Sequence, residues 1–264
     1  MIIKKMVFNL KAIFKIKRNE MKKIYYKFVK KYWSILSYEH AKKYNFKVQF
    51  GIFKNLKMYH EISWGKGDIA SKVYGIYENK IQKKLKDLNK PILIDIGAAD
   101  GFFAIGSLKS KICKYCYAFE ESKKSRENLL KTANINNVTT NLSILGKVTK
   151  DNFFSLLPSE IDFSKATILC DIEGGEYDFF TDDILANIKQ SNIIIEIHKS
   201  DNKKNIEIDL LERVRKYFNV SIIIDNNKNF KNILPLHSLN DIDRNLICSE
   251  GRSYIGKWWH LSPK

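Results

Sequence analysis

The sequence of 264 residues has little cysteine, little proline and no long apolar run. Its 4 cysteines are too few and too scattered to form the disulfide framework of a secreted domain. Its 4 prolines argue against a series of small domains joined by linkers. No run of 18 apolar residues occurs, so no helix is expected to span a bilayer. Because no cleavable signal sequence is recognisable either, we expect a folded protein of the reducing cytoplasm.

Acidic residues are scarce relative to basic ones. The 46 Lys and Arg residues outnumber the 29 Asp and Glu residues, which gives a net charge of +17. Such a charge is typical of proteins that bind nucleic acids or anionic membranes. Residues 1–49 hold 14 basic and 2 acidic residues, so +12 of the charge lies there and +5 on the rest. The body of the protein is therefore only mildly basic, and we do not expect it to bind nucleic acid.

The basic segment is expected to be helical. Over residues 1–47, apolar clusters alternate with lysines at spacings that predict a basic amphipathic arm of one or two helices. Residues 1–37 suit contact with an anionic leaflet, which would place the protein at the inner surface of the membrane. They suit equally well packing on the rest of the chain or on a second subunit of a homodimer. The sequence leaves these alternatives open.

An α/β pattern follows the arm. Residues 48–90 predict a lead-in or cap segment, with short strands or turns at 48–50 and 57–59 and a helix over about 71–88. Beyond residue 91, β-rich apolar runs alternate with helical stretches, so residues 91–264 predict a Rossmann-like, doubly wound, mostly parallel sheet. The strands are expected at 92–96, 115–120, 142–145, 167–172, 193–198, 220–224 and 256–261, and the helices near 102–111, 122–134, 177–190 and 204–217.

A glycine-containing turn connects the first of these strands to its helix. Residues 95–102 read Asp-Ile-Gly-Ala-Ala-Asp-Gly-Phe, and glycine there lets a ligand approach free backbone N–H groups. The next strand ends at Glu120, about 20 residues later, where a carboxylate can accept hydrogen bonds from two ribose hydroxyls. Either a nicotinamide dinucleotide or S-adenosylmethionine would fit a glycine turn followed by such an acid. Ala99 replaces the second glycine of the dinucleotide motif and Asp100 would repel a pyrophosphate, so the pattern favours the cationic S-adenosylmethionine.

Three motifs occur in order along the chain. They are residues 95–102, the run Ala118-Phe119-Glu120, and the run Asp171-Ile172-Glu173-Gly174-Gly175-Glu176. Together they resemble the FkbM-like branch of the class I S-adenosylmethionine-dependent methyltransferases, over about residues 90–200. The chain differs from that branch in having Glu121 where proline is frequent, and in its N-terminal extension.

The resemblance implies roles for five residues that bind the cofactor. Gly97, Ala98 and Gly101 would line the methionine moiety of S-adenosylmethionine, and Asp95 would hold the turn or the amino group of the donor. Glu120 would bind the ribose. The stretch near residues 145–147 would lie beside the adenine.

Acidic residues and a histidine gather at the ends of two further strands. Asp171 closes one strand, and Glu196 and His198 share one face at the end of the next. As catalytic residues, His198 would take a proton from an acceptor hydroxyl while the carboxylates orient it. As metal ligands, Asp171, Glu196 and His198 would hold a hard divalent ion such as Mg²⁺. A purely structural His–Glu pair is the third reading, and Glu176 is expected only to complement a helix dipole.

The resemblance implies O-methylation of a small molecule or a saccharide hydroxyl. An NAD-dependent oxidoreductase would use the same strand, turn and helix, although Ala99 and Asp100 disfavour it. The net positive charge is the argument for a nucleic-acid-binding or RNA-modifying protein. The acidic residues within 171–174 argue against it, because they would repel phosphates. A non-catalytic protein with the same fold is the remaining alternative.

Overall fold

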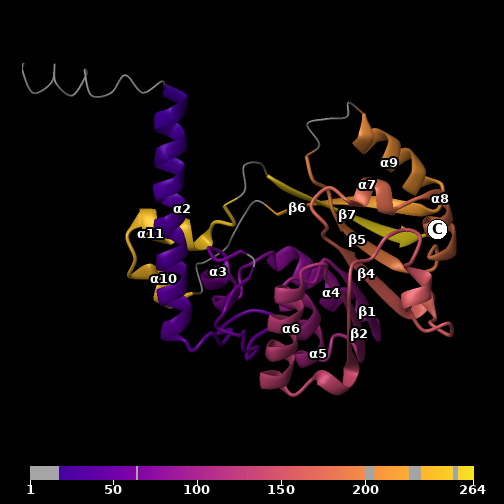
Figure 1. The fold of residues 1–264 in the computed structure, drawn as a ribbon, viewed down its shortest axis with the longest axis horizontal. Helices are drawn as coiled ribbons and strands as arrows, with labels where there is room; N and C mark the ends of the chain where they lie inside the picture. The colour runs from indigo at the N-terminus through magenta and orange to yellow at the C-terminus, as the bar shows by residue number, and fades with distance from the viewer. Residues whose placement is uncertain (1–17, 64, 200–204, 226–232, 252–254) are drawn as a thin grey trace, which may run out of the picture.

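The computed structural model describes residues 18–63, 65–199, 205–225, 233–251 and 255–264. This part of the chain contains a seven-stranded sheet with the strand order β3-β2-β1-β4-β5-β7-β6 (Figure 1). Strands β1 to β5 pair in parallel with their neighbours, and β7 runs antiparallel to both β5 and β6. The strands are β1 (Ile92–Ile96), β2 (Tyr115–Phe119), β3 (Leu142–Leu145), β4 (Ala166–Cys170), β5 (Asn192–Glu196), β6 (Phe218–Asp225) and β7 (Gly256–Pro263).

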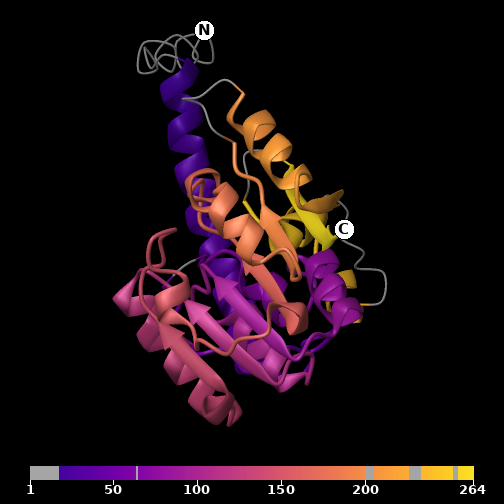
Figure 2. The same cartoon turned by 90° about the vertical axis from the view of Figure 1, so that its right-hand side faces the viewer.

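Helices cover both faces of this sheet (Figure 1; Figure 2). One face packs on α4 (Asn79–Leu88), α5 (Phe102–Lys109) and α6 (Lys123–Asn136), and the other on α7 (Glu176–Phe179), α8 (Asp182–Asn187) and α9 (Ile206–Arg215). Because side chains alternate along a strand, Leu93 joins the first core and Ile94 the second. Short 3₁₀ helices lie at Thr139–Asn141, Phe154–Leu156 and Phe163–Lys165. The predicted Rossmann-like, doubly wound fold is confirmed.

The strand order reverses between β1 and β4, which lie side by side at the centre of the sheet. The chain leaves β1 toward β2 on one side, and leaves β4 toward β5 on the other. The two connections therefore diverge and open a crevice at the carboxyl ends of these strands, which is where open α/β sheets bind ligands. The glycine turn after β1 and the acidic run after β4 both lie at this position.

Some predicted elements are wrong in their boundaries. The expected helix over 71–88 is two helices, α3 (Ile69–Val73) and α4, because Gly75 (φ +70°) and Glu78 (φ +42°) place left-handed backbone between them. Residues 48–50 and 57–59, expected as short strands or turns, form no strand in the described chain, where turns lie at 52–55 and an isolated bridge joins Lys47 to Lys57. The expected helix over 177–190 is divided into α7 and α8 at Thr181, whose side chain accepts a hydrogen bond from the Ile184 N–H.

Four helices pack together beside the sheet, and we call this group the cap. It consists of α2 (Arg18–Lys43), α3, α10 (Leu234–His237) and α11 (Asp241–Cys248). Its apolar cluster joins Tyr74 and Ala70 to Leu236 and Ile247, and the Tyr32 hydroxyl donates to Asp243 at 2.7 Å. Helices α10 and α11 belong to the connection between β6 and β7, for which the sequence predicted no helix. Two segments far apart in the sequence therefore build one cap (Figure 1).

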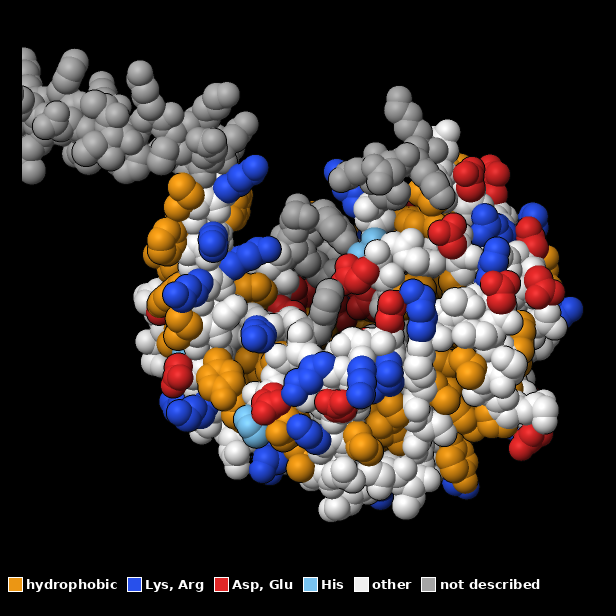
Figure 3. All heavy atoms as spheres, in the orientation of Figure 1, with side chains coloured by type: hydrophobic (Ala, Val, Ile, Leu, Met, Phe, Trp, Pro, Cys, Tyr) orange, Lys and Arg blue, Asp and Glu red, His pale blue; other side chains and the backbone are white. Residues whose placement is uncertain are grey.

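The outer part of α2 carries large apolar side chains that face solvent. Phe28 is 70% exposed, and Ile24, Tyr25, Tyr32 and Ile35 are also exposed. Lysines alternate with these apolar groups along the helix (Figure 3). Among the described residues, no helix is both long and apolar enough to cross a membrane. Residues 1–17 of the expected arm lie outside the described residues, so contact with an anionic membrane, homodimer formation and the three-part division at residues 47 and 90 stay predictions.

Candidate active site

A cavity of about 1260 Å³ runs along the carboxyl ends of the central strands. The residues after β1, β2, β4 and β5 line one side of it, and Lys30 and Lys72 of the cap line the other. Figure 3 shows the hollow between α2 and the sheet, with acidic side chains inside it. The sequence-predicted residues Asp95, Gly97, Ala98, Glu120, Asp171, Glu196 and His198 all line this cavity. Gly101 lies next to it, at the N-terminus of α5.

The glycine turn fits tightly against the loop that follows β4. Gly97 has φ +91°, and a Cβ atom there would lie 1.8 Å from the carbonyl oxygen of Asp171. The N–H groups of Gly97 and Ala98 both donate to the Phe119 carbonyl at 2.9 Å. Gly101 has φ +88° and caps α5. The turn therefore needs glycine at position 97 for close approach as well as for its backbone conformation.

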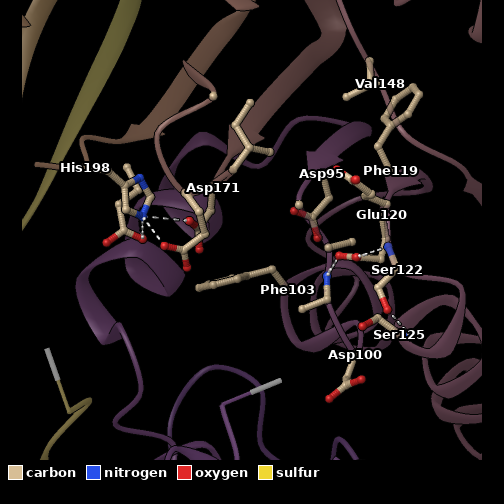
Figure 4. Close-up of a pocket in the computed structure, with 18 of the residues that line it drawn as sticks. Asp95, Asp100, Phe103, Phe119, Glu120, Ser122, Ser125, Val148, Asp171 and His198 are labelled. Atoms are coloured by element: carbon tan, nitrogen blue, oxygen red, sulfur yellow. Dashed lines mark hydrogen bonds and ion pairs between the residues drawn. The ribbon is translucent and has the colours of Figure 1, made fainter. Parts of the chain in front are cut away.

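Glu120 is held in a fixed orientation at the end of β2 (Figure 4). One carboxylate oxygen accepts from the Ala99 N–H at 2.9 Å, and the other accepts from the Ser122 N–H at 2.7 Å. The side chain is partly exposed and lines the cavity. Each oxygen keeps a second lone pair, so the carboxylate can also accept two hydrogen bonds from a ligand with neighbouring hydroxyls.

Asp95 is buried in the same turn, at the end of β1. Its Oδ2 atom has no hydrogen-bond partner among the described residues, although the side chain lines the cavity. Burial raises the pKa of Asp95 to about 7, a hydrogen bond from the Ala104 N–H opposes this, and the charge of Glu120 adds to it. The carboxyl group is therefore half protonated near neutral pH and would gain from a cationic partner.

We expect Asp95 to make the protein less stable as the pH rises. Its pKa is about 7 in the folded chain and 3.8 in the reference state, so folding binds a proton between these values. The free energy of unfolding should then fall by about 2–3 kcal/mol between pH 5 and pH 8. Asp95→Asn should remove most of this fall, as measured by urea unfolding of both proteins at the two pH values. An identical pH dependence in both proteins would show that Asp95 is ionised in the fold.

Asp100 lies in the turn, lines the cavity and is held by residues from other segments. Its carboxylate accepts hydrogen bonds from the N–H and the hydroxyl of Ser63, and lies 3.5 Å from the Asn128 amide nitrogen. Asn128 also donates to the Glu61 carbonyl at 2.7 Å. Asp100 thus fastens the segment before β1 to the glycine turn, a role that its position in the motif does not indicate.

His198 lies among carboxylates at the other end of the cavity (Figure 4). Its Nε2 atom is 3.5 Å from Asp171, 3.4 Å from Glu173 and 4.0 Å from Glu196. Its Nδ1 atom is 3.3 Å from Glu176. We call these four acids and the histidine the acidic cluster. The structure thus brings together Asp171, Glu196 and His198, as the sequence predicted.

The acidic cluster controls the protonation of His198. Burial alone would lower the pKa of the imidazole, but the contact with Glu176 and the charges of Glu196 and Asp171 outweigh burial and raise the pKa to about 9. At neutral pH the ring therefore holds its proton. For His198 to act as a base, its imidazole must first lose this proton, either at higher pH or when a bound cation displaces the proton.

Glu176 is the residue whose role the sequence analysis missed. It is fully buried, and its carboxylate accepts from the Gly174 N–H at 2.8 Å and from the His198 N–H at 2.9 Å. It thereby positions both the acidic loop and the histidine, rather than only complementing the dipole of α7. The signal in the sequence that could have indicated this role was the place of Glu176 as the last residue of the third motif.

The acidic cluster also contains a set of candidate metal ligands. Asp171, Glu196 and His198 each offer one ligand atom, and these atoms lie within 4.8 Å of one another. The two carboxylates suit a hard ion such as Mg²⁺, whereas an imidazole nitrogen suits Mn²⁺ or another transition metal better. The donor set therefore fits Mg²⁺ only in part.

Comparison with known proteins gives a mixed result. No protein-family model matches the chain, and no curated protein matches its sequence. Solved methyltransferase structures are similar to it at low identity. A precorrin-6y C5,15-methyltransferase from Geobacter metallireducens shares 9% identity and a TM-score of 0.46, with 72% of this chain and 92% of that one covered.

Two tRNA methyltransferases are similar to the same extent. TrmI from Aquifex aeolicus, a tRNA (m1A58) methyltransferase, shares 14% identity over 72% of this chain and 70% of its own, with a TM-score of 0.46. TrmK from B. subtilis, an M1A22 tRNA methyltransferase, shares 10% identity over 69% and 66%, with a TM-score of 0.43. These TM-scores lie below 0.5, so the fold assignment rests on the strand order. Membership of the FkbM-like branch stays a prediction.

Proposed function

We propose that this protein transfers a methyl group from S-adenosylmethionine to a hydroxyl group of a small molecule or a saccharide. The observation that carries the proposal is the arrangement of the cavity. At one end, Glu120 offers two oriented acceptors beside a tight glycine turn, and at the other end the acidic cluster surrounds open space. The mostly parallel seven-stranded sheet, with the three motifs of the resemblance at its carboxyl edge, also supports the proposal.

The donor would lie across the carboxyl ends of β1 and β2. Glu120 would accept hydrogen bonds from the two ribose hydroxyls, and Gly97 and Ala98 would line the methionine moiety. The positive amino group of the donor would lie near Asp95, whose charge favours it. The Rossmann-type alternative with a dinucleotide lacks this match, because a pyrophosphate would lie among carboxylates.

The acceptor would occupy the end of the cavity next to the acidic cluster. Methyl transfer needs the acceptor oxygen, the methyl carbon and the sulfur in line, exclusion of water and removal of one proton. The cap lines part of the cavity through Lys30 and Lys72 and limits access of water. Asp171, Glu196 and His198 are the groups close enough to one another to orient a hydroxyl and take its proton.

A divalent ion is a second way to activate the acceptor. Asp171, Glu196 and His198 would hold it, and a bound divalent ion lowers the pKa of a hydroxyl that it contacts. Because His198 must lose its proton to become a ligand, metal binding there would release a proton. Whether the donor set selects Mg²⁺ or Mn²⁺ is measurable by calorimetry with each ion.

The test of the proposed function is titration calorimetry of the full chain with S-adenosylmethionine and, separately, with NADH. We expect binding of S-adenosylmethionine in the micromolar range and none of NADH. A screen of sugars and small hydroxylated metabolites with a labelled methyl donor would then identify the acceptor. Binding of NADH alone would overturn the proposal in favour of an oxidoreductase.

His198→Ala should separate chemistry from cofactor binding. We expect turnover with the acceptor found in the screen to fall about 10²- to 10⁴-fold, the range that a positioned acid or base contributes. The affinity for S-adenosylmethionine should stay within about threefold, because the donor contacts lie at the other end of the cavity. His60→Ala, at an exposed histidine outside the cavity, is the matched control. Undiminished turnover of His198→Ala would assign the histidine a structural role.

A further inference from the structure

A buried lysine of the cap lines the same cavity as the acidic cluster. Lys72, on α3, is only 7% exposed. Its ammonium lies 4.7 Å from the ring centroid of Tyr77 and 5.8 Å from that of Phe102. Within the part of the chain that the structure describes, the ammonium forms these two ring contacts but no hydrogen bond or ion pair.

The position of Lys72 needs an explanation, because a buried charge is costly without a counter-charge. Ring contacts stabilise an ammonium by less than it costs to remove that ammonium from water. Asp68 and Glu250 line the same cavity, and each has an interaction of its own. An anionic group of a ligand would supply the missing charge.

A second feature beside Lys72 also favours an anion. Phe102, whose ring lies under the ammonium, is the first residue of α5, directly after the left-handed Gly101. The first N–H groups of a helix have no intrahelical acceptor, and the helix dipole makes this end positive. Of those in α5, the Ala104 N–H donates to Asp95. The ammonium of Lys72 and the N-terminus of α5 therefore present positive charge to the same part of the cavity.

We propose that Lys72 and the N-terminus of α5 form a binding site for a carboxylate group. A carboxylate fits because its two oxygens accept from both an ammonium and backbone N–H groups. The acidic cluster lines the same cavity, so a ligand that carries both a cationic group and a carboxylate would meet complementary charges there. The inference rests on the proposed function, since it assigns a partner to one end of that site.

Two ligands of the proposed reaction can supply this carboxylate. The first is the donor, whose methionine moiety carries an amino group and a carboxylate on one carbon. The second is the acceptor, which would then be an acidic molecule such as a uronic acid. The chemistry at Lys72 is the same in both cases, and the experiment has one arm for each source.

The variants are Lys72→Met, which keeps the length and the packing against the rings, and Lys72→Arg, which keeps the charge. Lys150→Met, at an exposed lysine that lines the other end of the cavity, is the matched control. In the donor arm, calorimetry measures binding of S-adenosylmethionine, of its decarboxylated analogue and of 5′-methylthioadenosine, which lacks the amino-acid end. In the acceptor arm, D-glucuronate and D-glucose are titrated into protein saturated with S-adenosylhomocysteine.

For a donor carboxylate, Lys72→Met should weaken S-adenosylmethionine binding about 10- to 100-fold, the effect of losing a hydrogen bond to a charged group. Binding of the two analogues should not change, and Lys72→Arg should restore part of the affinity. The unaltered protein should itself prefer S-adenosylmethionine to its decarboxylated analogue, a comparison that does not depend on any variant folding. For an acceptor carboxylate, the loss should occur with D-glucuronate alone.

The outcomes separate this inference from the proposed function. Tight binding of S-adenosylmethionine to the unaltered protein, with no loss in either arm on Lys72→Met, would overturn the carboxylate site and leave the methyltransferase proposal standing. Failure of the unaltered protein to bind S-adenosylmethionine would overturn both. Equal losses in Lys72→Met and Lys150→Met would show a general effect of charge, and would overturn a specific site.

Discussion

Gly97→Ala is expected to abolish binding of S-adenosylmethionine and to destabilise the fold by about 3 kcal/mol or more. Two costs combine at this position. The added Cβ atom would lie 1.8 Å from the Asp171 carbonyl oxygen, and the backbone has φ +91°, which an L side chain rarely adopts. The loop after β4 would have to move away from the turn, which would displace Asp171 from the cavity. Thermal unfolding and calorimetry with S-adenosylmethionine measure the two effects.

Gly146→Ala is the matched control for this substitution. No atom lies within 4 Å of the position that its Cβ would occupy, so the change should alter stability by no more than about 1 kcal/mol. Normal stability together with normal binding in Gly97→Ala would mean that the turn and the loop are further apart than the structure places them.

Glu120→Ala should have the second largest effect, a loss of about 100-fold or more in affinity for S-adenosylmethionine. This corresponds to about 2.7 kcal/mol. The change removes the acceptor of both ribose hydroxyls and leaves the N–H groups of Ala99 and Ser122 without their present partner. Titration calorimetry measures the affinity directly, and it requires no knowledge of the acceptor.

Glu121→Ala provides the comparison for Glu120. Glu121 is an exposed acid next to Glu120 that pairs with Lys147 at 3.0 Å. An exposed pair of this kind contributes little, so the affinity should change less than about threefold. Equal losses in the two variants would indicate a loss of negative charge rather than a specific contact with ribose.

Much of the sheet could be predicted from sequence because its strands are continuous apolar runs between polar stretches. β1 (Ile92–Ile96) and β3 (Leu142–Leu145) have the predicted bounds. The cap could not be predicted, because its helices are held by contacts between distant segments. Tyr74 and Leu236 are 162 positions apart, and neither belongs to a local pattern that indicates their contact.

The residues of the candidate site also divide into those that could be predicted from sequence and those that could not. The residues that follow the strands could be placed in one cavity, because parallel strands bring their carboxyl ends to one edge. Two other features of the site depend on side-chain geometry and could not be predicted from sequence. The Asp100 carboxylate accepts from Ser63, which lies outside the motif, and Lys72 reaches the cavity from a five-residue helix in the segment before β1. The pKa of His198 likewise depends on the distances to its acids, which the spacing along the chain does not determine.

The composition of the cap has a consequence for the order in which the protein folds during synthesis. Helices α2 and α3 leave the ribosome before the sheet, but their apolar partners in α10 and α11 follow only after β6. Strand β7, which pairs with both β5 and β6, comes later still. The nascent chain therefore carries the apolar side of α3 uncovered while most of the sheet is being made. A chain interrupted before residue 234 would therefore lack α10, α11 and β7, and with them half of the cap helices and the strand that pairs with both β5 and β6.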